Sequence, residues 1–124
     1  MNVVDSSAWL SWFADDGNAD RFAPAIEDTE RLLVPSITLT EVFKVVLRQR
    51  GETDALVAIA HMRQGRVVPL DDNLAIAAAQ YGAALKLPLA DSVIYATARV
   101  NGAQLWTQDG DFRELEDVHY FPKA

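Results

Sequence analysis

The sequence predicts an α/β fold in which helices cover both faces of a central parallel sheet. Short runs of β-branched and leucine residues alternate with longer helical patterns along the 124 residues. The strand-like runs are almost wholly apolar, as expected for strands that are buried on both faces. One or two helical segments separate successive runs, and parallel strands require such long connections.

The first half of the chain supplies two strands and four helices. Val3 and Val4 mark a strand at 2–4, and a helical stretch at 6–14 follows, with a second at 18–28. Two leucines and a valine predict a strand at 32–34, which Pro35 ends. A long helix is predicted at 36–50, stopped by Gly51, and another at 53–64.

The second half repeats the alternation. A strand is predicted at 66–70, and Asp71 and Asp72 then provide capping side chains for an alanine-rich helix at 74–86. An apolar helix at 89–101 ends before Gly102, and strands follow at 103–107 and 118–121. No repeat or linker interrupts the pattern, so residues 1–124 are predicted to form a single domain.

Composition excludes several kinds of site. The chain contains no cysteine, which rules out disulfides, thiolate metal sites and cysteine nucleophiles. No apolar run approaches the roughly 20 residues that span a membrane, and no signal peptide is evident, so we expect a cytoplasmic protein. The net charge of −7 disfavours a nucleic-acid ligand, but a site crowded with carboxylates would produce the same charge.

Acidic side chains collect at the predicted carboxyl edge of the sheet, where open α/β sheets bind their ligands. Asp5 directly follows the first strand, and Asp109 and Asp111 follow the fourth. A buried carboxylate without a partner is costly, so Asp5 should face other functional groups. The segment from Asp109 to Asp111 also has the composition of a turn in which Asp109 caps a short helix, and that structural role stays open.

Two helices each bring one more acid toward this edge. Asp91 lies in the first turn of the apolar helix 89–101, where the helix dipole alone would favour a carboxylate. We interpret it as functional because an acid on such an apolar helix needs a partner. Glu41 flanks the apolar stripe of helix 36–50, and pairing with Lys44 three residues later is the alternative to a functional role.

Carboxylates from four chain segments therefore converge on one edge. They would repel one another and raise each other's pKa unless a cation held them together. Oxygen-only ligands favour Mg²⁺ or Mn²⁺ over zinc. The two histidines, His61 and His119, have no partners nearby in the sequence and are interpreted as structural or exposed.

Four segments together resemble the PIN-domain ribonucleases, and among them the VapC-type toxins of toxin–antitoxin pairs. They are VVDSS at 3–7, SITLTEV at 36–42, LPLADSVIYATA at 87–98 and LWTQDGDF at 105–112. Each segment alone is moderately specific, whereas all four in this order, covering essentially the whole chain, are highly specific.

The resemblance implies a PIN-like three-layer α/β/α sandwich with a central, mainly parallel five-stranded sheet. It also implies an endoribonuclease that uses Mg²⁺ or Mn²⁺ to hydrolyse phosphodiester bonds in RNA. The family's catalytic acids would fall on Asp5, Glu41, Asp91 and Asp109, and the metal ligands on Asp5, Asp91 and Asp109. Ser6 and Thr107 would orient water or a carboxylate, and Asp111 matches an acid of secondary role.

The resemblance further implies partners. VapC-type toxins usually form homodimers and are neutralised by a VapB-type antitoxin whose tail lies across the site. Basic side chains should lead RNA to the acids, and the candidates are Lys44, Arg48, Arg50, Lys86 and Arg99, each of which is otherwise ordinary surface charge.

Other activities fit the residues less well. A haloacid-dehalogenase-type phosphatase would need a second acid at the position of Ser7, and a receiver domain would need an acid pair after the first strand. A housekeeping PIN nuclease, or a PIN module that binds RNA or protein without catalysis, stays open as an alternative.

Overall fold

The structure is a computed structural model that describes residues 1–123. Five short strands form one sheet: β1 (Asn2–Val4), β2 (Leu32–Pro35), β3 (Arg66–Val68), β4 (Gln104–Thr107) and β5 (Val118–Tyr120). The helices are α1 (Ser6–Ala14), α2 (Ala19–Glu27), α3 (Ser36–Arg50), α4 (Glu52–Met62), α5 (Asp72–Leu85) and α6 (Leu89–Val100). Two 3₁₀ turns, η1 (Thr29–Arg31) and η2 (Gly110–Phe112), complete the described elements.

The sheet has the order β3-β2-β1-β4-β5, and every neighbouring pair is parallel. The predicted α/β sandwich with a five-stranded sheet is therefore confirmed. The first strand in the sequence lies at the centre, between β2 and β4. This placement brings the residues that follow β1 and β4 side by side at the carboxyl edge.

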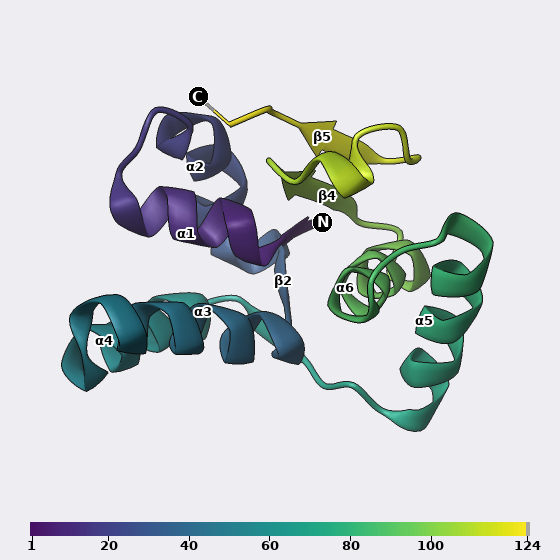
Figure 1. The fold of residues 1–124 in the computed structure, drawn as a ribbon, viewed down its shortest axis with the longest axis horizontal. Coiled ribbons are helices and arrows are strands. Elements are labelled where there is room, and N and C mark those ends of the chain that lie inside the picture. Colours follow the sequence, from purple (N-terminus) through teal and green to yellow (C-terminus); the bar gives the residue numbers. More distant parts are fainter. Residues whose placement is uncertain (124) are drawn as a thin grey trace.

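Successive strand residues bury their side chains on opposite faces of the sheet, as the pleat requires. Val4 and Val34 belong to the core that α1, α2, α3 and α4 cover. Val3 and Leu33, one residue earlier in each strand, belong to the core under α6. Figure 1 shows the two helical layers, with α5 and α6 on the opposite side of the sheet from α1 and α2.

The two helices of the second layer approach each other closely beside the sheet edge. Gly82 of α5 faces Ser92 of α6, and a Cβ atom on that glycine would collide with the Ser92 hydroxyl. Ser92 in turn donates to the carbonyl oxygen of Pro88, the residue before α6, over 2.9 Å. The close approach fixes the start of α6, which carries Asp91.

Most predicted element bounds agree with the structure to within one or two residues. Helix 53–64 is observed as Glu52–Met62, and the strand at 66–70 ends at Val68. Asp71 caps α5 by accepting from Leu74 N over 2.8 Å, as its position predicted. No helix among residues 1–123 combines the length and apolarity needed to cross a membrane.

Candidate active site

Asp5 is placed by the end of the central strand and by the start of α1. Its backbone N–H donates to Trp106 O over 3.1 Å and so extends the pairing of β1 with β4. Its side chain caps α1 by accepting from Ala8 N over 3.0 Å. Two hydroxyl groups also donate to it, Ser7 Oγ over 2.8 Å and Thr107 Oγ1 over 2.8 Å.

Burial dominates the electrostatics of Asp5. The residue is 3% exposed, and desolvation raises its pKa from 3.8 to about 6. The hydrogen bonds from Thr107, Ala8 and Ser7 lower the pKa, while the charge of Asp109 raises it further. Asp5 is thus a buried carboxylate whose charge is only partly compensated by donors.

Thr107 links Asp5 to the acids that follow β4. Its hydroxyl donates to Asp5 and accepts from the backbone N–H of Asp109 over 2.8 Å. Asp109 Oδ1 then accepts from Asp111 N over 2.9 Å, which caps η2. The capping role considered for Asp109 is therefore present, and it leaves the second carboxylate oxygen of Asp109 without a capping partner.

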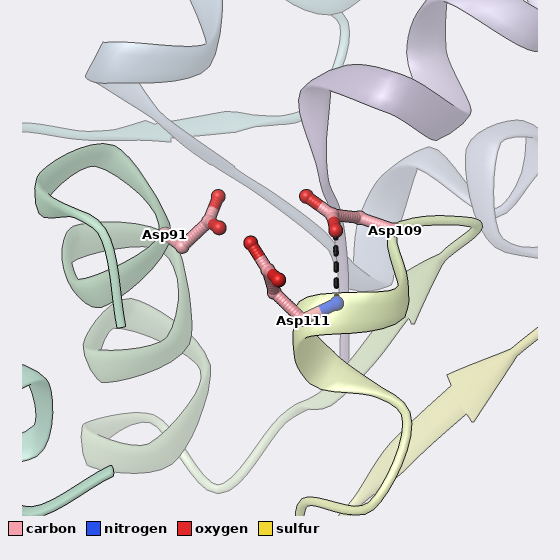
Figure 2. Close-up of side chains that lie close together, drawn as sticks. All are labelled: Asp91, Asp109 and Asp111. Atoms are coloured by element: carbon pink, nitrogen blue, oxygen red, sulfur yellow. Dashed lines mark hydrogen bonds between the residues drawn. The ribbon is translucent and has the colours of Figure 1, made fainter. Parts of the chain in front are cut away.

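Three carboxylates face one another at this edge. Asp91, Asp109 and Asp111 each offer an oxygen, and these three atoms lie within 4.8 Å of one another. Figure 2 shows Asp91 reaching from α6 toward the two acids at η2. We call these three side chains the acidic cluster. At such separations two carboxylates repel by ~1 kcal/mol in water and by ~3 kcal/mol at an effective dielectric constant of 20.

The electrostatics of Asp91 reflect this crowding. Its pKa is raised from 3.8 to about 7 by desolvation first, then by the charge of Asp109, by a hydrogen bond and charge from Asp111, and by Asp5. Among residues 1–123, no lysine, arginine or histidine forms an ion pair with any member of the acidic cluster. The negative charge of these three carboxylates is therefore not neutralised by an ion pair among residues 1–123.

The donor set suits a hard divalent cation. All candidate ligands are carboxylate oxygens, which Mg²⁺ and Mn²⁺ prefer. Two oxygens on opposite sides of Mg²⁺ stand about 4.2 Å apart, and the three carboxylate oxygens lie no more than 4.8 Å from one another. The histidines lie elsewhere: His61 stacks edge-on against Trp12, and His119 lies flat on Trp106.

The remaining predicted site residues do not belong to the acidic cluster. Glu41 is half-buried on α3 and accepts from Ser6 Oγ over 2.6 Å. No ion pair joins it to Lys44 within residues 1–123. Glu41 and Asp5 both lie outside the three-carboxylate group. The basic candidates Lys44, Arg48 and Lys86 are exposed.

One basic candidate, Arg99, lies at the opposite end of the sheet from the acidic cluster. Arg99 lies in the last turn of α6 and forms ion pairs with Glu116 and Asp117, next to Gln104 at the start of β4. The expectation that Arg99 lines an RNA groove at the carboxyl edge is therefore wrong.

Sequence reasoning missed Ser7 and assigned a minor role to Asp111. Ser7 donates to both oxygens of Asp5 and accepts from Gln108 N over 3.4 Å. Its position two residues after Asp5 is the feature of the sequence that could have indicated this contact. Asp111 was recognised in the sequence, but only the η2 turn shows that its carboxylate lies beside that of Asp91.

Known families and structures agree with this architecture. The family model of the PIN domain matches residues 3–118 of the chain. The chain belongs to the PIN-domain family. No curated protein matches its sequence.

Several solved structures share the whole fold, among them a toxin and a toxin–antitoxin complex. A toxin–antitoxin complex from Klebsiella pneumoniae superposes with a TM-score of 0.83 at 18% identity, covering 99% of this chain and 100% of that one. Mycobacterium tuberculosis VapC20, described as a toxin that cleaves the sarcin–ricin loop, gives 0.80 at 23% identity, covering 98% and 100%. DNA-bound VapBC from Salmonella typhimurium gives 0.74 at 18% identity, covering 98% and 97%. These likenesses establish the common fold of this PIN domain.

Proposed function

We propose that this PIN domain is a Mg²⁺- or Mn²⁺-dependent endoribonuclease and the toxin of a type II toxin–antitoxin pair. The observation that carries the proposal is the acidic cluster of Asp91, Asp109 and Asp111, none of which forms an ion pair with another side chain of residues 1–123. Structural neighbours that are VapC-type toxins or their antitoxin complexes support the biological part of the proposal.

Each residue of the site would have a distinct role. Asp91, Asp109 and Asp111 would hold the cation, and Asp5 would either join them as a ligand or keep the edge negative from its buried position. Bound there, a divalent cation would polarise the scissile phosphate and lower the pKa of a coordinated water. Thr107 would keep Asp5 and Asp109 in register through its two hydrogen bonds.

Glu41 would act on the water molecule that attacks the phosphate. It accepts one hydrogen bond from Ser6 and lies on a different helix from the acidic cluster. From that side it would take the proton of the nucleophile as a general base or help to hold a second cation. Ser6 would fix the orientation of the carboxylate in either role.

The RNA would approach over a surface that also carries basic side chains. Lys44 and Arg48 follow Glu41 along α3, and Lys86 ends α5 shortly before the turn that carries Asp91. We propose these three exposed residues as contacts to RNA phosphates. We also propose that the chain forms a homodimer, acts in the cytoplasm and is neutralised by a VapB-type antitoxin.

Expression in a bacterial host tests the proposal. Induction of the wild-type chain should arrest growth, and co-expression of a small neighbouring gene should restore it. Asp109→Asn should abolish the arrest, whereas Asp72→Asn, a change at an exposed first-turn aspartate of α5, should leave it intact. Harmless expression together with RNA cleavage by the purified protein would make the chain a housekeeping PIN nuclease instead. Harmless expression without cleavage would make it a binding module.

A further inference from the structure

One face of α6 contacts the same segment of the chain along three successive turns. Asp91, Tyr95 and Arg99 are spaced four residues apart, so their side chains lie on the same face of the helix. The segment opposite them is residues 108–117, which joins β4 to β5 and which we call the β4–β5 connection. Its near end carries Asp109 and Asp111 of the acidic cluster, and its far end carries Glu116 and Asp117.

Tyr95 holds the middle of this contact. The side chain is buried, and its hydroxyl donates to the carbonyl oxygen of Glu116 over 3.1 Å. Its ring stacks on that of Phe112, with centroids 6.4 Å apart and an interplanar angle of 29°. Phe112 is fully buried and directly follows Asp111. The position of Asp111 is thereby tied to α6 through its neighbour.

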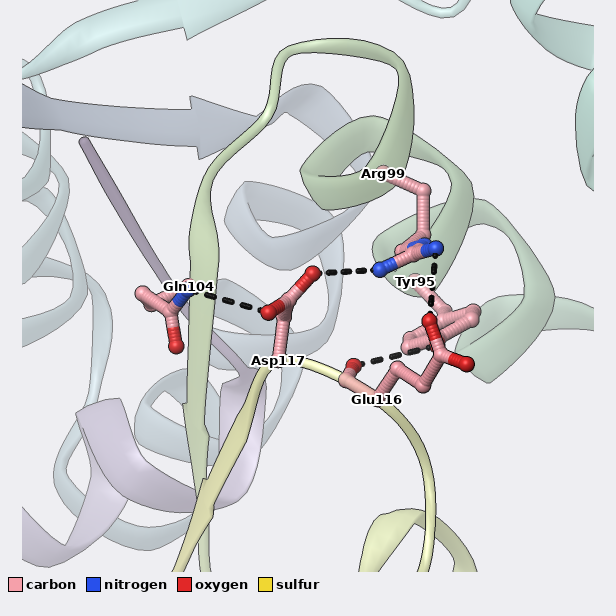
Figure 3. Close-up of polar contacts among 5 residues, drawn as sticks. All are labelled: Tyr95, Arg99, Gln104, Glu116 and Asp117. Carbon is pink, nitrogen blue, oxygen red and sulfur yellow. Dashed lines mark hydrogen bonds and ion pairs between the residues drawn. The ribbon is translucent and has the colours of Figure 1, made fainter.

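Arg99 holds the far end. Its guanidinium pairs with Glu116 over 3.1 Å and with Asp117, and the arginine side chain is 26% exposed. Asp117 has a left-handed backbone with φ of 61°, and its carbonyl oxygen accepts from Leu105 N over 2.9 Å. Figure 3 shows Arg99 and Gln104 approaching Asp117 from α6 and from β4. The end of the connection is therefore bound to both elements.

The near end has no such ion pair within the described chain. Asp91 and the two acids of the connection repel, and no basic side chain among residues 1–123 pairs with them. Helix α6 and the β4–β5 connection are thus pushed apart where the acids meet and held together one and two helical turns away.

We propose that Tyr95 and Arg99 are positioning residues that keep the acidic cluster assembled before a cation binds. This inference rests on the proposed function, because it assigns to these residues the affinity of the site for its divalent ion. Neither side chain touches the ion or the RNA. Each acts by fixing the β4–β5 connection against α6, so that Asp109 and Asp111 stay within reach of Asp91.

Two measurements on the purified protein test the inference. The first is the Mn²⁺ dissociation constant by calorimetry, and the second is amide hydrogen exchange of residues 109–117 in EDTA. Arg99→Ala should weaken Mn²⁺ binding about three- to five-fold and speed exchange in the connection. Tyr95→Phe removes the hydroxyl donor to Glu116 but keeps the ring, and should weaken binding about two- to three-fold. Arg99→Lys should retain more affinity than Arg99→Ala.

Arg31→Ala is the matched control, since Arg31 makes a surface ion pair with Asp28 over 3.6 Å on η1. It should change neither the dissociation constant nor exchange at 109–117. Unchanged affinity and exchange in folded Arg99→Ala and Tyr95→Phe would overturn the inference while leaving the metal site in place. If the wild type binds no Mn²⁺, the proposed function fails. Exchange in EDTA would then still decide whether Tyr95 and Arg99 hold the connection.

Discussion

Replacing Asp91 with asparagine should stabilise the metal-free protein while removing a proposed metal ligand. Asp91 takes part in none of the side-chain hydrogen bonds recorded among residues 1–123, apart from the contact with Asp111 that raises its pKa. Asparagine has nearly the same shape but no charge. The substitution therefore removes repulsion within the acidic cluster at little cost in packing.

The expected gain in the free energy of unfolding follows from the raised pKa of Asp91. Burial and neighbouring acids raise the pKa of Asp91 from 3.8 to about 7. Each pKa unit corresponds to about 1.4 kcal/mol, so the full rise would correspond to ~4 kcal/mol. Because Asp91 is only half-buried, solvent screening reduces the expected difference to ~1–2 kcal/mol.

The difference in stability between the wild type and Asp91→Asn depends on pH. A carboxyl group whose folded pKa exceeds its unfolded pKa favours the folded state below the unfolded value, and this contribution is lost as pH rises through the folded value. The wild type should therefore lose stability relative to Asp91→Asn between about pH 4 and pH 8. At pH 4 the two proteins should be nearly equal in stability.

Urea unfolding in EDTA at pH 4, 6 and 8 measures this difference. Asp54→Asn is the matched control, because Asp54 and Asp91 both occupy the third position of a helix. The control loses only a favourable interaction with the helix dipole and should be slightly less stable than the wild type at pH 8. If Asp91→Asn were no more stable than the wild type at pH 8, mutual repulsion within the acidic cluster would be refuted.

Three further outcomes are expected. Adding Mg²⁺ or Mn²⁺ at ten times its dissociation constant should raise the free energy of unfolding of the wild type by about 1.4 kcal/mol, and Asp91→Asn should lose most of that gain in thermal melts. Glu41→Gln should slow RNA cleavage by about 10²–10⁴-fold if Glu41 is the general base, and Ser6→Ala by about tenfold, as measured in single-turnover assays. A result in which Ser6→Ala is as slow as Glu41→Gln would mean that the hydroxyl does more than orient the carboxylate. Gly82→Ala should destabilise the fold by ~1–3 kcal/mol in urea titrations, because the added methyl group collides with Ser92; unchanged stability would show that α5 and α6 can separate freely.

Local patterns in the sequence were sufficient to predict the elements and the edge where the acids meet. Apolar runs such as Val3-Val4 report burial on both faces directly, and the carboxyl end of each strand follows from chain direction alone. Strand order does not follow in this way. The position of β1 between β2 and β4 depends on long-range pairing, and it is this pairing that brings Thr107 to Asp5.

Side-chain geometry limited the prediction of the site. The η2 turn, which no hydrophobic period encodes, brings Asp111 beside Asp91. Arg99 follows Asp91 by eight residues on one helix, which separates them by about 12 Å along its axis. That rise explains why an arginine near the Asp91 segment in sequence lies at the opposite end of the sheet.

Single-turnover cleavage of RNA by the purified protein tests the central claim most directly. The wild type should cut RNA with Mg²⁺ or Mn²⁺ present and should be inactive in EDTA. Asp5→Ala should be inactive in both conditions, whereas Asp15→Ala, which alters an exposed residue at the end of α1, should cleave at the wild-type rate. Cleavage that persists in EDTA, or undiminished cleavage by Asp5→Ala after contaminating nucleases are excluded, would contradict a carboxylate-held metal site.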